Sequence, residues 1–327
     1  MEKSFLTYEE QLTLLRQEKN ISCETPQEHA LLRRIGYFNL VHGYRMPFLT
    51  GFTLDGSGIY LNGTHLTHLA EVKRFDDDLR HLLFRSITAI EEEVRTFAAY
   101  AFSDENGGLD WIDPCAYGTT IENGDFRAMM HRATREIEHC DLPYVSGYIQ
   151  RKQKIPTFIM TKVVYLFTFI SFLDLCNSDV KTRLCHLYGL YNKHGYPDHK
   201  LLLASFHWIR RIRNVCAHNE RLFTFDGTTR GGQSNRIKAS YFKLLPVSYT
   251  RTISPLKIMD LLVYFKYYLN GPDYDALIGE ISAMLTTLEA RIPEVAFGRV
   301  RASMGIRDVH HLTALRSAPK VIDYHGF

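Results

Sequence analysis

The stretch SFHWIRRIRNVCAHNERL, residues 205–222, gathers more groups able to bind a phosphate and move a proton than any other run of the chain. Trp208 and Ile209 supply an apolar side, while four arginines and two histidines supply a polar one. This mixture predicts a helix that buries one side and presents a basic, histidine-bearing side, with a turn at Asp226-Gly227 beyond it.

Helical geometry sharpens this prediction. At about 100° per residue, one narrow sector of an ideal helix carries four polar side chains, namely His207, Arg211, Asn214 and His218. Arg213 lies roughly 140° from His218, so the two side chains do not meet on a straight helix. Three arrangements would join them: a long reach by Arg213, a distorted helix end, or a second copy of the helix from another chain.

Composition places the chain among folded globular proteins. It has 327 residues, of which 45% are hydrophobic, enough for one large or two ordinary domains. The net charge of +3, from 39 basic and 36 acidic residues, is too small to prove nucleic-acid binding, but it permits a local basic patch. The six cysteines form no Cys-x-x-Cys pair, which favours buried, reduced thiols in a cytosolic protein.

Membrane insertion is not expected. The N-terminus, MEKSFLTYEEQ, lacks the apolar core of a signal peptide. The most apolar run, Val163–Leu173, is eleven residues long, short of the roughly 18 that span a bilayer. We therefore expect a soluble, cytoplasmic protein in which Pro156 starts a buried core helix containing this run.

The N-terminal segment shows two helix starts and an aromatic block. Capping boxes at Thr7 and Thr25 each have glutamate three residues later. The block IGYFNLVHGYRMPF, residues 35–48, predicts a short helix between tight turns that docks on a larger body through its aromatic side chains, namely Tyr37, Phe38, Tyr44 and Phe48. Residues 50–64 are glycine-rich and predict a loop or a small hairpin.

A long amphipathic pattern runs from Thr67 to about Phe102, with apolar residues at intervals of three to four. It predicts one long helix or two nearly continuous ones. Glu91 and Arg95 are four residues apart and share a face of it. They are either an exposed ion pair or a pair that supports the arginine–histidine site from a facing helix.

The remaining chain also has helical patterns. We expect helices near residues 125–140, over Pro255–Leu269 and Tyr274–Arg291, and a weaker one after Arg307. No strand array or internal repeat is visible, so the fold class is all-α. Three parts follow, within one compact unit: an N-terminal helical and aromatic segment (1–64), a helical core (65–224), and a basic loop with a C-terminal helical region (225–327).

The segment RNVCAHNERLF resembles the RN-x-x-x-H signature of HEPN domains, in particular that of AbiD/AbiF-type abortive infection proteins. LLRRIGYFNLVHGYRMPF resembles the N-terminal block of that family. The long amphipathic segment resembles its FDxxLR…IExxxR pattern, and Met304-Gly305 resembles its MGFP ending. The matches in the long segment are Phe75, Asp76, Leu79, Arg80, Ile90, Glu91 and Arg95. These blocks follow the order of the family.

The resemblance implies an all-α, HEPN-type helical bundle with N-terminal and C-terminal extensions. It also implies metal-independent RNA cleavage, which yields 2′,3′-cyclic phosphate and 5′-hydroxyl ends. The implied catalytic residues are Arg213, Asn214 and His218. His218 would carry a proton near neutral pH, and Arg213 would bind the phosphate oxygens. Asn214 would orient the imidazole or bind the phosphate.

Other residues complete the predicted site. The supporting residues are Glu91, Arg95, His207 and Arg211, although His207 beside Trp208 is also readily explained by packing. The predicted RNA contacts are Arg210, Arg221, Arg230 and Arg236, of which the last two lie in a basic loop after the helix. No Asp, Glu, Cys and His set has metal-ligand spacing, and no Gly-x-x-x-x-Gly-Lys loop is present. We therefore expect no metal and no cofactor.

HEPN domains generally act as dimers, and the offset between Arg213 and His218 makes the same demand. We expect a homodimer in which both motifs face a shared groove and RNA is the substrate, with no DNA and no membrane partner. A second interpretation is a non-catalytic module that holds a small, structured regulatory RNA. A third is a structural protein-interaction module. An RNA that restrains the enzyme would reconcile the first two.

Overall fold

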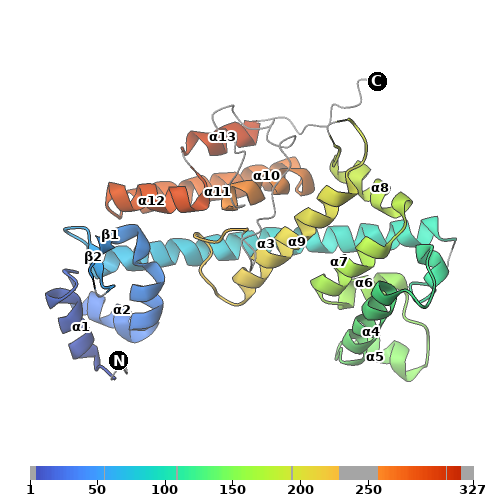
Figure 1. Cartoon of the computed structure of the whole chain (residues 1–327), viewed down its shortest axis with the longest axis horizontal. Helices are drawn as coiled ribbons and strands as arrows, with labels where there is room; N and C mark the ends of the chain where they lie inside the picture. The colour runs from blue at the N-terminus through green and yellow to red at the C-terminus, as the bar shows by residue number, and fades with distance from the viewer. Residues whose placement is uncertain are drawn as a thin grey trace.

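The computed structural model describes residues 5–54, 56–107, 110–192, 194–227, 257–306 and 308–317. Most of these residues are helical, so the all-α prediction is confirmed (Figure 1). Within the described ranges the only sheet is a two-stranded antiparallel hairpin of β1 (Leu49–Phe52) and β2 (Gly58–Tyr60). It falls where the glycine-rich segment predicted a small hairpin.

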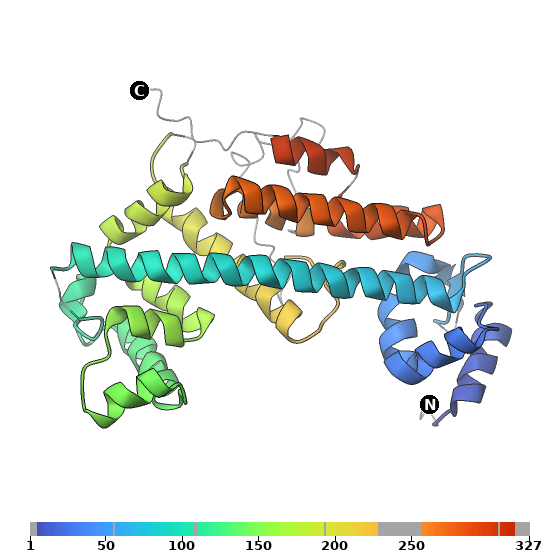
Figure 2. The ribbon, with the colours of Figure 1, turned by 180° about the vertical axis from the view of Figure 1, so that it is seen from behind.

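One helix, α3 (Leu66–Glu105), is the axis of the molecule, and the predicted long amphipathic helix is confirmed. Its 40 residues correspond to a length of about 60 Å. The N-terminal helices lie at one end of α3 and a second lobe lies at the other end, both on the same side (Figures 1 and 2). The C-terminal helices lie along the opposite side of α3.

The N-terminal lobe begins with α1 (Tyr8–Gln17) and α2 (Pro26–Ile35), and both predicted capping boxes are present. A π-helical turn, η1 (Phe38–His42), and a 3-10 turn, η2 (Met46–Phe48), connect α2 to β1. Tyr44 and Phe48 are buried as expected, whereas the prediction that Phe38 docks into the body is wrong, because Phe38 is 75% exposed. On η1 the inward positions belong to Leu40 and Val41.

The second lobe contains η3 (Pro114–Tyr117), α4 (Gly124–Glu138), α5 (Pro143–Gln150), α6 (Thr157–Val163) and α7 (Leu166–Leu175). The expectation of one apolar helix from Pro156 to Leu173 is wrong, because Val164 and Tyr165 are extended and separate α6 from α7. Arg95 of α3 donates hydrogen bonds to the carbonyls of Thr161 and Val164. A buried cation from a distant helix therefore satisfies carbonyl groups that the break leaves open.

Helix α8 (Ser178–Tyr188) leads into α9 (His199–Ala217), which crosses α3 near the middle of its length (Figure 1). Helix α9 packs against α3, α7, α8 and α10, and it buries Phe206, Trp208, Ile209 and Ile212. Full burial of each such side chain contributes about 1.5–3 kcal/mol. The apolar side predicted for this helix is therefore what fixes α9 to the body.

The C-terminal region folds into α10 (Ile258–Tyr268), α11 (Gly271–Glu289), α12 (Glu294–Met304) and α13 (His310–Ser317). The sequence predicted three of these and missed α12. Every residue of α10 is buried, and α11 packs along α3. Among the described residues, no helix is both long enough and apolar enough to cross a bilayer.

Candidate functional site

Helix α9 ends inside the stretch that carries the motif. Its last residue is Ala217, and His218 is the C-cap. Asn219 has a φ of 56°, and its N–H donates to the Cys216 carbonyl while the Glu220 N–H donates to the Val215 carbonyl at 3.0 Å. This is the Schellman ending, in which a left-handed residue turns the chain away from the helix axis. The helix thus stops before Asp226-Gly227, and the turn predicted at that pair is not found among the described residues, where the turn lies at Phe223-Thr224 instead. His218 is exposed at the end of the helix.

Two buried charged residues of α3 anchor the chain that follows His218. The Asp76 carboxylate is fully buried and accepts hydrogen bonds from the Leu222 and Phe223 N–H groups, the latter at 2.7 Å. It also accepts from the Tyr44 hydroxyl at 3.0 Å. The chain after His218 is therefore tied to both α3 and the N-terminal lobe.

Arg80 completes this anchor. Its Nη1 donates to Asp76 at 2.6 Å, and its Nη2 donates to the Asn219 Oδ1 at 2.7 Å. The Glu220 carbonyl accepts a further hydrogen bond from Nη1. Sequence reasoning placed Asp76 and Arg80 in a family block but assigned them no role. A sign of that role was present, because an Asp–Arg pair four residues apart on an apolar stripe indicates a buried ion pair.

His218 lies in a pocket of about 750 Å³ between the end of α9, α3 and the N-terminal lobe. We call it the His218 pocket. Its cationic lining residues are Arg34, Lys73, Arg80 and Arg221, and its aromatic ones are Phe38, His42 and Tyr44. His42 is a second histidine in the same pocket, which sequence reasoning did not single out. Its position within the conspicuous block IGYFNLVHGYRMPF was the available signal.

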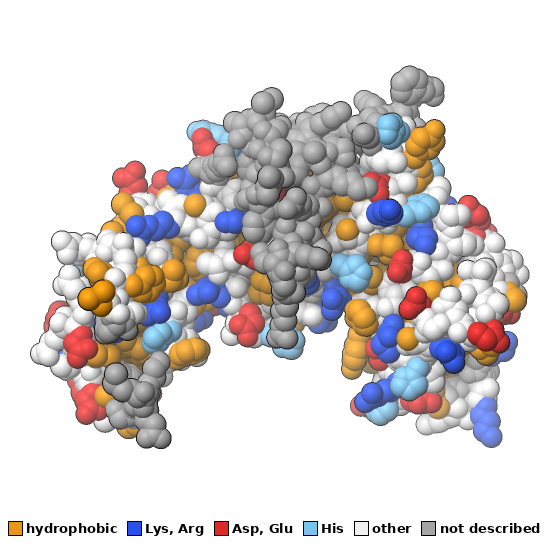
Figure 3. Space-filling model, viewed as in Figure 1, with side chains coloured by type: hydrophobic (Ala, Val, Ile, Leu, Met, Phe, Trp, Pro, Cys, Tyr) orange, Lys and Arg blue, Asp and Glu red, His pale blue; other side chains and the backbone are white. Residues whose placement is uncertain are grey.

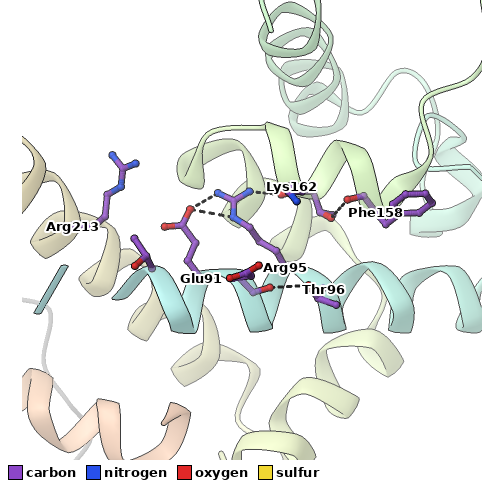
Figure 4. Close-up of a pocket in the computed structure, with 9 residues that line it drawn as sticks. Glu91, Arg95, Thr96, Phe158, Lys162 and Arg213 are labelled. Atoms are coloured by element: carbon purple, nitrogen blue, oxygen red, sulfur yellow. Dashed lines mark hydrogen bonds and ion pairs between the residues drawn. The ribbon is translucent and has the colours of Figure 1, made fainter. Parts of the chain in front are cut away.

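Arg213 lies in a different pocket of about 460 Å³, which we call the Arg213 pocket (Figure 4). Its lining comes from α3, α6 and α9 and includes Glu91, Arg95, Phe158 and Lys162. The Arg213 guanidinium lies over the Phe84 ring, 5.8 Å from its centroid. Within the described part of the chain it makes no ion pair and no hydrogen bond, and its Nε is buried without a partner. Its donors therefore remain available for an anion.

Glu91 and Arg95 form a buried pair beside Arg213. Oε1 of Glu91 accepts from Arg95 Nη2 at 2.6 Å and from Nε at 3.1 Å, and the two side chains are 15% and 9% exposed. The Arg95 guanidinium also stacks on Phe169 at 4.9 Å. The interpretation of this pair as an exposed surface salt bridge is wrong. It lines the Arg213 pocket and holds the α6–α7 break in place.

The remaining helix residues occupy separate environments. Asn214 is half-buried one turn before His218 and lines neither pocket, although its carbonyl accepts from the His218 N–H at 2.9 Å. His207 is also half-buried outside both pockets, and burial, followed by the nearby Arg210 charge, lowers its pKa. Arg211 donates to the Gly227 carbonyl and lies over the Trp208 and Phe225 rings.

The predicted RNA-contacting arginines are divided in the same way. Arg210 lies over the Phe167 ring at 5.1 Å, toward the second lobe. Arg221 lines the His218 pocket and donates to the Gly43 carbonyl and the Thr224 hydroxyl. Arg230 and Arg236 lie outside the described residues. Among the described residues, no group of three or more Asp, Glu, Cys or His side chains is arranged to hold a metal ion.

The two pockets lie on opposite sides of the end of α9. In Figure 3 the lower edge of the molecule is indented between the N-terminal lobe and the second lobe, and Lys, Arg and His side chains lie along this hollow together with acidic and hydrophobic ones. The structure therefore brings Arg213 together with Glu91 and Arg95, and His218 together with the Asp76–Arg80 anchor. It does not bring Arg213 and His218 of one chain into one pocket.

The chain matches the family described as Abi-like protein over residues 30–224. The match covers more than half of the chain, and it includes every residue that lines either pocket. Helices α10 to α13 lie outside it. Comparison with curated proteins and with solved structures found no match. The chain belongs to the Abi-like protein family.

Proposed function

We propose that this protein acts in abortive infection as a HEPN-type endoribonuclease, with Arg213 and His218 supplied to one groove by two copies of the chain. The family membership supports the role in abortive infection. The resemblance of the segment RNVCAHNERLF to the HEPN signature supports the reaction. The positions of the two side chains support the dimer.

The proposed reaction needs a base, an acid and a cation. A ribose 2′-hydroxyl loses its proton to the base and attacks the adjacent phosphorus, and the P–O5′ bond then breaks. The departing 5′-oxygen takes a proton from the acid. This leaves a 2′,3′-cyclic phosphate and a 5′-hydroxyl. The exposed His218 suits either proton transfer near neutral pH. Arg213, whose donors are unpaired within the described residues, suits the negative charge on the phosphate oxygens.

The main support for a dimer is that Arg213 and His218 of one chain lie in separate pockets. They line different pockets on opposite sides of α9. In α3, Arg80 beside the His218 pocket and Glu91 beside the Arg213 pocket are eleven residues apart, a rise of about 16 Å. A phosphate held in the Arg213 pocket therefore does not lie in the pocket that contains the imidazole of the same chain. A two-fold axis through the hollow beside α9 would place Arg213 and His218 of a second chain beside those of the first. One histidine would then serve as the acid and the other as the base.

Cleavage by a shared groove is testable by subunit mixing. After exchange at equal proportions of parent and His218→Ala chains, we expect about one quarter of the parent activity, because only parent–parent dimers hold both histidines. Chains that act alone would retain about one half. RNA fragments are checked for 2′,3′-cyclic phosphate ends, and light scattering reports the oligomeric state. A protein that remains monomeric at micromolar concentration with RNA and without it would contradict the proposal.

The cationic lining of the His218 pocket also favours a second candidate, a non-catalytic module that holds a structured RNA. Purification without nuclease treatment separates the two. If RNA copurified with the parent has the same 3′ ends as RNA copurified with the His218→Ala variant, the binding module is favoured. Cyclic phosphate ends that require His218 favour the ribonuclease.

A further inference from the structure

The His218 pocket has a surplus of positive charge. Four cationic side chains line it, against the single carboxylate of Glu220. Two of the cations are already used, because Lys73 pairs with Asp77 at 2.7 Å and Arg80 is held in the buried anchor. Arg34 and Arg221 remain for a ligand.

These two arginines differ in how firmly they are held. Arg34 is exposed at the end of α2 and has no ion pair or hydrogen bond within the described part of the chain. Arg221 is held by Thr224 and Gly43 through Nε and Nη1, and among the described residues its Nη2 has no partner. A fixed guanidinium with one unpartnered nitrogen and an exposed, unpaired guanidinium line the same pocket, and together they suit a phosphate group, which accepts several charge-assisted hydrogen bonds.

An exposed aromatic surface adjoins these arginines. Phe38 is 75% exposed, although it lies on the wall of the pocket. Its ring stacks on His42 with a centroid distance of 5.7 Å and an interplanar angle of 28°. Tyr37 also packs edge-on against His42, with ring centroids 5.6 Å apart, so His42 is held between contacts with two aromatic rings. A supported, solvent-exposed ring is the platform on which unpaired nucleobases stack in RNA-binding proteins.

We propose that the His218 pocket binds one nucleotide of single-stranded RNA, with the base stacked on Phe38 and the phosphate between Arg34 and Arg221. The proposal rests on the ribonuclease function only in taking RNA as the substrate. The pocket volume of about 750 Å³ lies within the range of about 300–1,000 Å³ that is usual for ligand pockets. A nucleotide bound here places its sugar–phosphate beside His218, so the N-terminal lobe acts as the substrate-positioning part of the site.

Single-stranded RNA fits this lining better than an acidic protein segment does. Carboxylates would satisfy the arginines but leave the face of Phe38 without a planar partner. A base in a duplex is already stacked and has no free face for Phe38. The combination of an exposed aromatic ring with the unpartnered donors of Arg34 and Arg221 therefore selects an unstacked nucleotide.

The test is fluorescence anisotropy with a 5′-labelled, mixed-sequence single-stranded RNA of twelve nucleotides. All proteins carry Arg213→Ala, which lies in the other pocket and prevents cleavage during the measurement. We expect Phe38→Ala to weaken binding about tenfold with no change in its salt dependence. We expect Arg34→Ala to weaken binding to a similar degree and to lower the slope of log K against log salt by about one. Phe38→Tyr should bind as the background protein does.

Two matched controls separate the pocket from general effects. Arg33→Ala removes a neighbouring charge of α2 that lies over Tyr8 and outside the pocket. Phe52→Ala removes an exposed aromatic ring from the hairpin, also outside the pocket. Both should bind RNA within about twofold of the background protein. Circular dichroism checks that every variant is folded.

Each outcome decides the proposal. Equal losses for Arg34→Ala and Arg33→Ala would overturn it, as would tight binding by Phe38→Ala or absence of RNA binding by the background protein. If RNA cleavage requires Arg213 and His218 while the pocket variants bind like the controls, the ribonuclease stands and the nucleotide pocket fails. If the pocket variants lose binding but the parent leaves RNA intact, the pocket stands and the ribonuclease fails.

Discussion

The His218 pocket and the Arg213 pocket flank the same helix end, yet they are built differently. The His218 pocket is wide, cationic and walled by the N-terminal lobe. The Arg213 pocket is smaller, and the Glu91 carboxylate and the Arg95 guanidinium in its lining already pair with each other. In each, α3 contributes an i,i+4 acid–arginine pair, Asp76–Arg80 or Glu91–Arg95, that holds backbone groups of another segment. The charged residues of α3 thus fix the surrounding backbone, while the short motif on α9 places Arg213 and His218 in different pockets.

The largest expected effect is a loss of RNA cleavage without a matching loss of stability. His218→Ala and Arg213→Ala should each lower RNA cleavage by at least about 100-fold, because one removes a proton carrier and the other a phosphate donor. The unfolding free energy should change little, since His218 is exposed and Arg213 makes no ion pair in the described part of the chain. Cleavage assays with labelled RNA and urea denaturation measure the two quantities. His81→Ala, at an exposed position of α3, is the control, and parent-like cleavage by both site variants would reject the catalytic roles.

Asp76→Asn tests the frame of the His218 pocket. The asparagine amide cannot accept from Arg80, Tyr44 and two backbone N–H groups at once, and it removes the fully buried one of the two carboxylates, Asp76 and Asp77, that pair with Arg80. We expect a loss of about 3–5 kcal/mol in the free energy of unfolding. Asp78→Asn, at an exposed site two residues later, should change it by less than about 0.5 kcal/mol. Equal urea midpoints for the two variants would mean that Asp76 does not anchor the chain after His218.

Glu91→Gln tests the frame of the Arg213 pocket and should have a smaller effect. Arg95 keeps its hydrogen bonds to the Thr161 and Val164 carbonyls, so we expect a loss of about 2 kcal/mol in the free energy of unfolding. Glu92 lines the same pocket from an exposed position, so Glu92→Gln serves as the control. If Glu91→Gln lowers the free energy of unfolding as much as Asp76→Asn does, the two ion pairs contribute equally to stability.

The smallest effect concerns His207, which lies on α9 outside both pockets. Burial lowers its pKa below the ordinary value of 6.5. The unfolded chain then binds the proton more readily than the folded one, so stability present above about pH 6.5 is lost as the pH falls. His207→Gln should flatten the decrease in unfolding free energy between about pH 7 and 5, measured by urea denaturation. His81→Gln should leave the decrease unchanged, and identical pH profiles for the parent and His207→Gln would contradict this account.

Local patterns predicted the helices whose signals are contained in neighbouring residues. The capping boxes at Thr7 and Thr25 start α1 and α2, and the apolar intervals of α3 predicted one long helix or two nearly continuous ones, of which the structure has the first. The break at Val164–Tyr165 could not be predicted in this way, because no proline or glycine marks it and its stabilising donor, Arg95, is distant in sequence. Phe38 was assigned to the core for a similar reason, since aromatic character does not specify the side of η1 that faces inward.

The features of the candidate site also fall into two groups, those that follow from local sequence and those that depend on the packed chain. The sequence by itself determined the all-α class, the long helix α3 and the motif residues Arg213, Asn214 and His218, because hydrophobic periodicity and residue chemistry are local properties. Only the tertiary structure decided that α9 ends at His218, that Asp76 and Arg80 anchor the chain after it, and that His42 shares its pocket. These features depend on which distant groups meet when apolar faces are buried, and that is a property of the packed chain.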